Sequence, residues 1–187
     1  MAEIIIDGIR ATYSIRGENA ALLCPPHPLM GGNRFDVRLE RISSDLMKRN
    51  ISVLRFDYQQ PFRGGIGEIE DAKKCVAYLK DRHDKIAIIG YSFGSVVASN
   101  VAEYCNTAIY LSPIPEINSI SFRDAMVPKL FIVATQDQFV SLEESLRIFE
   151  EASEPKEIVK VETDHFYFGK FDYISRIVAD FVVKQSF

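Results

Sequence analysis

The sequence predicts an α/β fold in which a mostly parallel sheet of about eight strands is covered by helices on both faces. Segments with strand and helix periodicity alternate from residue 35 to residue 183, a pattern typical of successive βαβ crossovers. Several strand segments, such as residues 86–89, are continuously apolar, as expected of strands buried on both faces. Ligands bind such sheets at the carboxyl ends of the strands, so we expect the chemistry there.

The first 24 residues have a different pattern from the rest of the chain. Isoleucines dominate residues 3–7, Asp7-Gly8 is a hairpin-type dipeptide, and residues 10–16 alternate polar and apolar side chains. Residues 20–24 form a short apolar run after a turn. We therefore expect an antiparallel meander, with the first two strands antiparallel to the rest of the sheet.

The remaining elements follow from hydrophobic periodicity. Helices are expected where apolar residues recur every three or four positions, at residues 35–49, 68–82, 92–104, 142–151 and 171–183. Strands are expected at the short apolar runs, at residues 51–56, 86–89, 108–111, 129–134 and 158–161. The stretch between residues 111 and 127 is expected to be irregular. No repeat or linker interrupts the pattern, so we expect one domain over residues 1–187.

Composition narrows the function classes. The 187 residues carry a net charge of -4, which gives no electrostatic attraction to nucleic acid or anionic lipid. No segment approaches the ~18 apolar residues of a membrane span, and residues 1–7 do not resemble a signal peptide. Cys24, Cys75 and Cys105 are odd in number and widely spaced, which favours reduced thiols over disulfides or a metal clip. We expect a cytoplasmic protein without nucleic-acid or membrane partners, either a monomer or a homodimer.

The strongest motif is Gly90-Tyr91-Ser92-Phe93-Gly94, which stands between an apolar strand and a helix. Gly-x-Ser-x-Gly in this context is the nucleophile elbow, a turn so tight that the serine is strained and its flanking glycines cannot carry a Cβ. The following helix contributes free N–H groups, which favour a developing negative charge. The alternative is a glycine-rich turn with a capping serine. We predict Ser92 as a nucleophile.

A serine nucleophile needs a base, and the chain offers three histidines. His165 directly follows the last predicted strand and comes after Ser92, in the order this kind of site requires. His83 lies in a polar connection and is expected to be a solvated loop residue. His27 lies in a proline-rich loop before Ser92 and is expected to hold that loop rather than act in catalysis. We predict His165 as the general base.

The acid of the site should follow a strand between Ser92 and His165. Asp137 lies three residues after the strand at 129–134, where it could orient the imidazole of His165. A role for Asp137 as a helix cap is disfavoured, because Ser141 and Glu144 form a capping box closer to the next helix. Asp164, next to His165, and Glu116, after the preceding strand, are the rival acids.

Backbone N–H groups should stabilise the oxyanion. One donor is expected to be Phe93, directly after the nucleophile, and the other should come from the loop at residues 24–32. Pro28 has no N–H, so Leu29 is the favoured donor and Met30 the second choice. The expected substrate pocket consists of His27, Met30, Phe62, Tyr91, Ile114, Phe139 and Phe166.

The chain resembles compact, lidless α/β-hydrolases of the dienelactone-hydrolase-like kind over nearly its whole length. The segments that carry the resemblance are Pro26-His27-Pro28 with Gly31-Gly32, Leu54-Arg55-Phe56-Asp57, Phe62-Arg63-Gly64, residues 67–72, the elbow and Asp164-His165-Phe166-Tyr167. The resemblance implies the α/β-hydrolase fold and the triad Ser92, Asp137 and His165. Two departures stand out: Pro25 replaces a histidine common in the first loop, and Ala134-Thr135 replaces a glycine common before the acid.

These features together predict a serine hydrolase that transfers a small acyl group from an ester or thioester to water, without a metal or organic cofactor. The insert between residues 111 and 129 is short and proline-containing, which predicts an open site with no lid. Two alternatives remain open: an amidase or peptidase using the same triad, and a non-catalytic binding protein on a hydrolase scaffold.

Overall fold

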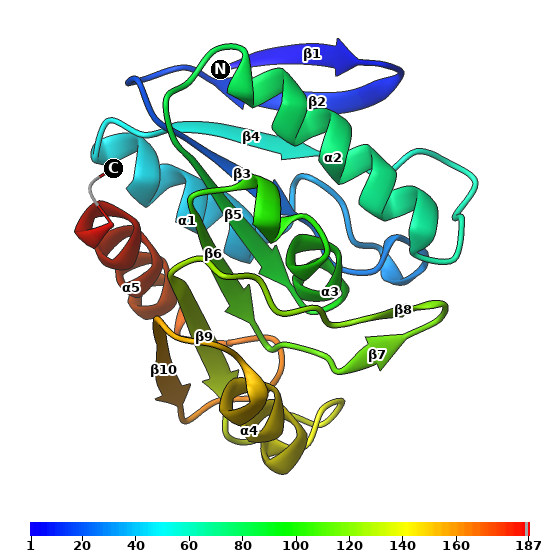
Figure 1. Ribbon diagram of the computed structural model, residues 1–187, viewed down its shortest axis with the longest axis vertical. Helices are drawn as coiled ribbons and strands as arrows, with labels where there is room; N and C mark the ends of the chain where they lie inside the picture. The colour runs from blue at the N-terminus through cyan, green and yellow to red at the C-terminus, as the bar shows by residue number, and fades with distance from the viewer. Residues whose placement is uncertain (186) are drawn as a thin grey trace.

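The computed structural model describes residues 1–185 and 187, and its main sheet has eight strands. These strands are β1 (Ala2–Ile6), β2 (Ile9–Ser14), β3 (Ala20–Cys24), β4 (Ser52–Phe56), β5 (Ile86–Tyr91), β6 (Thr107–Leu111), β9 (Lys129–Ala134) and β10 (Lys156–Val161). The helices are α1 (Val37–Lys48), α2 (Ile66–Lys80), α3 (Phe93–Ser99), α4 (Leu142–Glu151) and α5 (Phe171–Lys184). The spatial order is β1-β2-β4-β3-β5-β6-β9-β10, which confirms the predicted α/β architecture (Figure 1).

The prediction for the first strands was wrong in two respects. β2 pairs antiparallel with both β1 and β4, so β2 alone runs against the sheet and β1 has the direction of the parallel strands. β3 does not continue a meander; it lies between β4 and β5 and is parallel to both, with Leu22 opposite Leu54 and Ile88. The reason is burial: every residue of β3 is apolar and 0% exposed, which only a central position covered on both faces provides.

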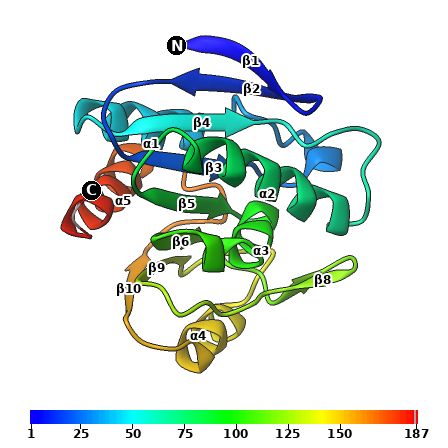
Figure 2. The ribbon, with the colours of Figure 1, turned by 45° about the horizontal axis from the view of Figure 1, so that its top comes forward.

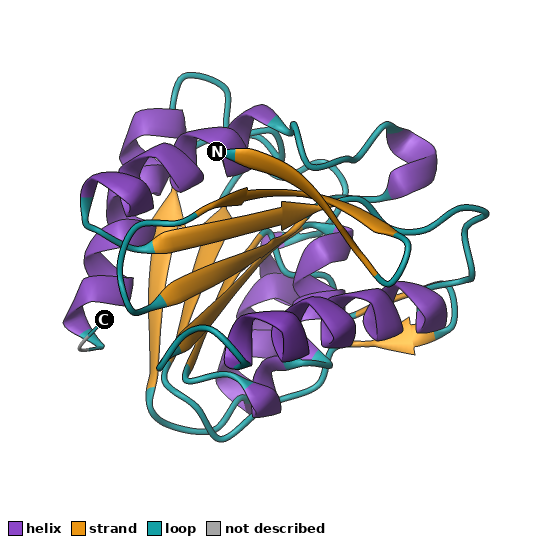
Figure 3. Cartoon of the chain, turned by 90° about the horizontal axis from the view of Figure 1, so that it is seen from above, coloured by secondary structure: helices purple, strands orange, loops and turns teal. Residues whose placement is uncertain are grey.

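Two layers of helices cover the sheet (Figure 3). α1 and α5 pack on one face, where Leu39 and Ile42 meet Val178 and Val182 in one apolar cluster. α2, α3 and α4 contribute to the cluster on the other face, which includes Val76, Val97 and Ile148. Burial of these apolar stripes is the main source of stability, and it fixes the carboxyl ends of the central strands as a rigid platform.

The segment between β6 and β9 contains a feature that the sequence did not predict. β7 (Glu116–Ile117) and β8 (Ile120–Ser121) form a small antiparallel hairpin beside α3 (Figure 2). The described residues of this segment form no helical lid. α3 is also shorter than expected, since it ends at Ser99 and a separate 3-10 turn (Ala102–Tyr104) follows. At this end Asn100 donates from Nδ2 to Ser121 O of β8 at 2.9 Å.

Candidate active site

Ser92 lies in a sharp turn between β5 and α3, at the carboxyl end of the sheet. Its backbone has φ 55° and ψ -123°, and its N–H donates to Leu111 O of β6 at 2.9 Å. Space requires both glycines, since a Cβ on Gly90 would lie 2.1 Å from Gly94 O, and one on Gly94 would lie 2.2 Å from Cys24 O. The turn therefore has the strain and the close backbone packing that the motif predicts.

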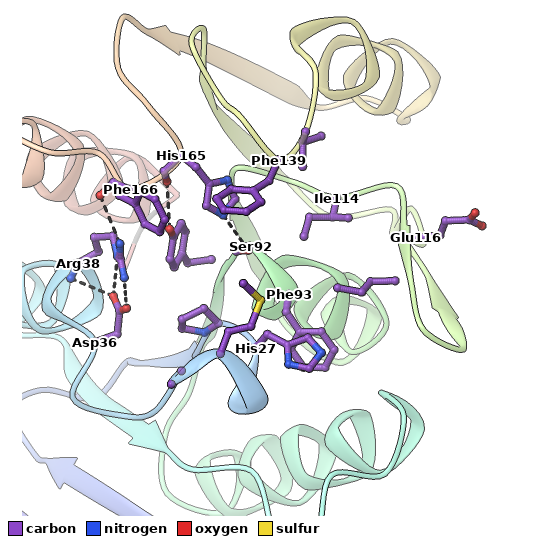
Figure 4. A pocket seen from close by; sticks show the side chains of 17 residues that line it. His27, Asp36, Arg38, Ser92, Phe93, Ile114, Glu116, Phe139, His165 and Phe166 are labelled. Carbon is purple, nitrogen blue, oxygen red and sulfur yellow. Dashed lines mark hydrogen bonds and ion pairs between the residues drawn. The ribbon is translucent and has the colours of Figure 1, made fainter.

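The imidazole of His165 connects the two other predicted triad residues. Its Nε2 lies 3.0 Å from Ser92 Oγ (Figure 4), and its Nδ1 lies 2.7 Å from Asp137 Oδ2. The side chains of His165 and Asp137 are only 6% and 2% exposed. The fold thus brings Ser92 and Asp137, which lie 73 and 28 positions before His165 in the chain, into contact with its imidazole.

Backbone hydrogen bonds hold the Asp137 carboxylate in place. The N–H groups of Phe139 and Val140 donate to its Oδ1 at 2.9 and 3.0 Å, which leaves Oδ2 for His165. Burial alone would raise the pKa of Asp137, but the hydrogen bonds from His165, Phe139 and Val140 outweigh it and hold this pKa below its ordinary value. A charged Asp137 favours the tautomer with a proton on Nδ1 and a free lone pair on Nε2, facing Ser92.

The two rival acids, Asp164 and Glu116, make no hydrogen bond with His165 through their carboxylates. Asp164 Oδ1 accepts the N–H of Phe166 at 3.0 Å within its own turn, and the Glu116 side chain points away from Ser92 (Figure 4). The predicted capping box is also present, because Ser141 Oγ accepts the N–H of Glu144 at 3.2 Å and the Glu144 carboxylate accepts the N–H of Ser141 at 2.9 Å. Asp137 is therefore free of a capping role for α4.

Three side chains hold the turn that carries His165. Tyr91 Oη donates to His165 O at 3.0 Å, and Gln138 Oε1 accepts the N–H of His165 at 3.1 Å. Arg38 Nη1 contacts Phe166 O at 3.4 Å. The sequence did not identify Gln138 or Arg38; the position of Gln138, next to the predicted acid, is the one local signal that could have drawn attention to it.

The loop after β3 folds around His27, which caps a short 3-10 turn (Pro28–Met30). Most of its N–H groups donate within the loop: Leu29 to His27 Nδ1 at 3.2 Å, Met30 and Gly32 to His27 O at 3.0 Å, and Gly31 to Pro28 O at 3.3 Å. Pro25, Pro26 and Pro28 have no N–H. Among the described residues, the N–H of His27 has no acceptor, whereas that of Leu29, the expected donor, is already in use.

A cavity of about 390 Å³ opens above Ser92. Six of the seven predicted pocket residues line it, namely His27, Met30, Tyr91, Ile114, Phe139 and Phe166. Phe62 does not line it; its ring packs 4.8 Å from the ring of His27 and 6.0 Å from that of Phe93. Lining residues that the sequence analysis missed include Asp36, Arg38 and Ile117. They belong to the start of α1 and to the unpredicted hairpin, neither of which shows a sequence motif.

The other predicted features lie outside this site. His83 contacts Tyr13 Oη and, through Nδ1, Glu18 O at 3.2 Å, so it is a structural residue of the N-terminal sheet edge. The three cysteines are buried and unpaired, and burial raises the pKa of Cys105 to about 12. Over residues 1–185 and 187, no group of three or more His, Cys, Asp or Glu side chains could hold a metal ion. No helix in that part of the chain is both long and apolar enough to span a membrane.

Solved structures show the same fold. An alpha-beta serine hydrolase homologue from Coxiella burnetii superposes with a TM-score of 0.86 at 22% identity, covering 96% of both chains. A serine hydrolase without a lid from Xanthomonas campestris gives 0.85 at 18% identity, covering 98% of this chain and 94% of the other. Est1E from Butyrivibrio proteoclasticus, solved with ferulic acid bound, gives 0.82 at 16% identity, covering 99% of both.

Comparison of the sequence with known proteins and with family models identifies one family. No curated protein sequence gives a significant match to the chain. The model of the dienelactone hydrolase family matches residues 50–165, more than half of the chain, from β4 to the histidine that faces Ser92. With its eight-stranded sheet, its elbow and this match, the chain belongs to the dienelactone hydrolase family and is a lidless α/β-hydrolase that acts on ester bonds.

Proposed function

We propose that the chain hydrolyses a small ester or thioester through an acyl-enzyme intermediate on Ser92. The observation that carries the proposal is the continuous hydrogen-bonded series Asp137–His165–Ser92, with separations of 2.7 and 3.0 Å. His165 Nε2 accepts the hydroxyl proton as Ser92 Oγ attacks the carbonyl carbon, and Asp137 stabilises the imidazolium. The proton then passes to the leaving alcohol or thiol. In the second half-reaction, water attacks the acyl-enzyme with His165 again as base.

The oxyanion of the tetrahedral intermediate needs two N–H donors. Phe93 is the first residue of α3, so its N–H has no partner within the helix and lies at the positive end of the helix dipole. For the second donor we assign His27 in place of Leu29, because the Leu29 N–H donates to His27 Nδ1 while the His27 N–H has no acceptor among the described residues. The reaction in this form uses no metal or organic cofactor.

Labelling of the serine tests this proposal. A fluorophosphonate probe should modify the wild-type chain at Ser92, and Ser92→Ala should remain unlabelled and lose p-nitrophenyl ester turnover by roughly 10⁶-fold in kcat. Equal labelling of the variant, or a wild type that neither reacts nor turns over esters, would contradict the proposal and favour a binding protein on this scaffold. Turnover of p-nitroanilides at rates like those of the matching esters would identify an amidase instead.

A further inference from the structure

The charged groups around the cavity are few and unequal in sign. Among the residues that the structure describes, and apart from the two histidines, the charged lining residues are Asp36, Arg38 and Glu116, which is one cation against two carboxylates. Glu116 lies at the exposed edge on β7, and its side chain points away from Ser92 (Figure 4). An anionic substrate would therefore depend on Arg38 for a partner.

Arg38 is already committed to other groups. Its Nε donates to Asp36 Oδ1 at 2.9 Å, and its Nη2 pairs with Asp36 Oδ2 in a two-point ion pair. Its Nη1 contacts Phe166 O at 3.4 Å, and its guanidinium carbon lies 4.4 Å from the centre of the Tyr91 ring. The side chains of Arg38 and Asp36 are only 13% and 7% exposed. The cation is thus neutralised inside the cavity wall and fixed there.

Asp36 is held as firmly as its partner. It is the N-cap of α1, and its Oδ1 accepts the N–H groups of Arg38 and Leu39 at 3.0 and 3.4 Å. The carboxylate therefore also compensates the positive end of the α1 dipole. Releasing Arg38 would require the Asp36 carboxylate to move, which would break the helix cap and the buried ion pair together. The fold therefore keeps the Asp36–Arg38 pair intact and its net charge at zero.

The rest of the lining favours apolar groups. Six apolar side chains also line the cavity. They come from the loop after β3, from the segment around β7, and from the loops that carry Asp137 and His165: Met30, Ile114, Ile117, Phe139, Val140 and Phe166. A carboxylate that entered here would lose its hydration and gain no free cation, which is costly. An acyl chain would bury apolar surface at no such cost.

We propose that this cavity selects esters that are uncharged on the acyl side and discriminates against acyl groups that carry a carboxylate. The reason is that Asp36 neutralises Arg38, the one Lys or Arg side chain that the described residues place in the cavity wall. This inference rests on the proposed esterase function. It assigns Asp36 as a specificity residue: it prevents Arg38 from acting as an anion site. Asp36→Asn should then create one, since asparagine preserves the helix cap while it removes the neutralising charge.

A matched pair of substrates tests the proposal. p-Nitrophenyl hexanoate and mono-p-nitrophenyl adipate have acyl chains of equal length and differ by a terminal methyl against a carboxylate. The wild type should show kcat/KM for the adipate ester lower by about 100-fold. In Asp36→Asn this ratio should narrow by about 10-fold or more. Asp180→Asn, which removes a carboxylate from an exposed ion pair with Arg49 outside the cavity, is the control and should leave the ratio within about 3-fold.

A salt titration of the wild type gives a second test that does not depend on any variant. Discrimination that arises from lost hydration inside the cavity should persist between about 0.05 and about 0.5 M salt, because screening acts mainly on exposed charges. Its disappearance at high salt, or equal turnover of the two esters, would overturn the inference while leaving the esterase function intact. Turnover of neither ester, together with no labelling of Ser92, would instead show that the proposed function has failed.

Discussion

At the scale of single residues, His27 combines a proposed role for its backbone N–H, as an oxyanion donor, with a structural role for its side chain. The ring packs 4.8 Å from the rings of both Phe62 and Phe93, while Nδ1 accepts the Leu29 N–H and Nε2 lies 3.2 Å from Asn118 Nδ2. Burial lowers the pKa of His27, partly offset by Glu68, so the ring stays neutral and can accept a hydrogen bond. The side chain thereby fixes the loop, and the loop presents the His27 N–H.

A pair of variants separates these two tasks. His27→Pro removes both the N–H and the imidazole, at a backbone φ of -59° that proline adopts without strain, whereas His27→Ala removes only the imidazole. The proline variant should have a kcat lower than that of the alanine variant by about 10²–10³-fold, the usual cost of one oxyanion donor. Steady-state ester kinetics on both variants, with circular dichroism to confirm folding, would measure this difference. Equal values of kcat would exclude the His27 N–H as a donor.

The sequence identified the side chains of the site better than its backbone groups. That Ser92, Asp137 and His165 lie together could be predicted, because each follows a recognisable strand and bears a reactive group. The choice between Leu29 and His27 could not, because it depends on which N–H the local hydrogen bonds leave free. The role of Asp36 and Arg38 in the cavity wall could not be predicted either. In the sequence they resemble an ordinary polar start of a helix, and only the fold shows that they line the cavity.

At the scale of elements, the elbow depends on space that a single methyl group would fill. Gly94 and Gly169 offer a comparison: a Cβ on Gly94 would lie 2.2 Å from Cys24 O, whereas Gly169 has φ 71° but nothing within 4 Å. Gly94→Ala should therefore lower the free energy of unfolding by about 3 kcal/mol or more, because backbone must move. Gly169→Ala should cost only about 1 kcal/mol, from its left-handed backbone. Urea denaturation would measure both; equal losses would mean that the elbow tolerates the contact.

Element boundaries were predicted well where burial and periodicity agree. β3, β9 and α4 begin and end where expected. The pairing of strands was predicted less well than their boundaries. The sequence predicts β3 beside β2 in a meander, whereas its buried apolar residues place it at the centre of the sheet, between β4 and β5. The β7–β8 hairpin was missed because strands of two residues have no period to detect. The error over β3 concerns strands that are distant in sequence, whereas the hairpin is a local pair that is too short to leave a pattern.

At the scale of the whole molecule, buried carboxylates connect stability to pH. Asp45 of α1 accepts from Ser175 Oγ of α5 at 2.6 Å and from Lys48 Nζ at 2.8 Å, which joins the two helices on one face of the sheet. Burial would raise the pKa of Asp45, but its hydrogen bonds to Lys48 and Ser175 hold it below the ordinary value. Asp137, whose side chain is buried, and the exposed Asp124 also have lowered pKa values. The folded state therefore binds fewer protons than the unfolded chain at mildly acidic pH.

The sign of the effect follows from linkage. Carboxyls with a lowered pKa stabilise the fold above their ordinary pKa of 3.8, and this stabilisation is lost as the pH falls through the lower folded-state value. Asp45→Asn should cost about 1–2 kcal/mol at pH 7, and the difference from wild type should shrink below about pH 4. Denaturation at several pH values would measure it. Glu157→Gln, at an exposed ion pair with Lys184, is the control and should change little at any pH.

The backbone of Ser92 has a consequence for how the chain balances activity against stability. With φ 55° and ψ -123°, this position suits glycine, yet it carries the hydroxyl that the proposed reaction uses as its nucleophile. Replacing alanine by glycine usually destabilises a protein, but here Ser92→Gly should unfold at a higher temperature than Ser92→Ala, by an amount equivalent to about 1 kcal/mol. Differential scanning calorimetry of the two inactive variants would decide it. A higher unfolding temperature for Ser92→Gly would mean that the side chain at this position is retained at a cost in stability.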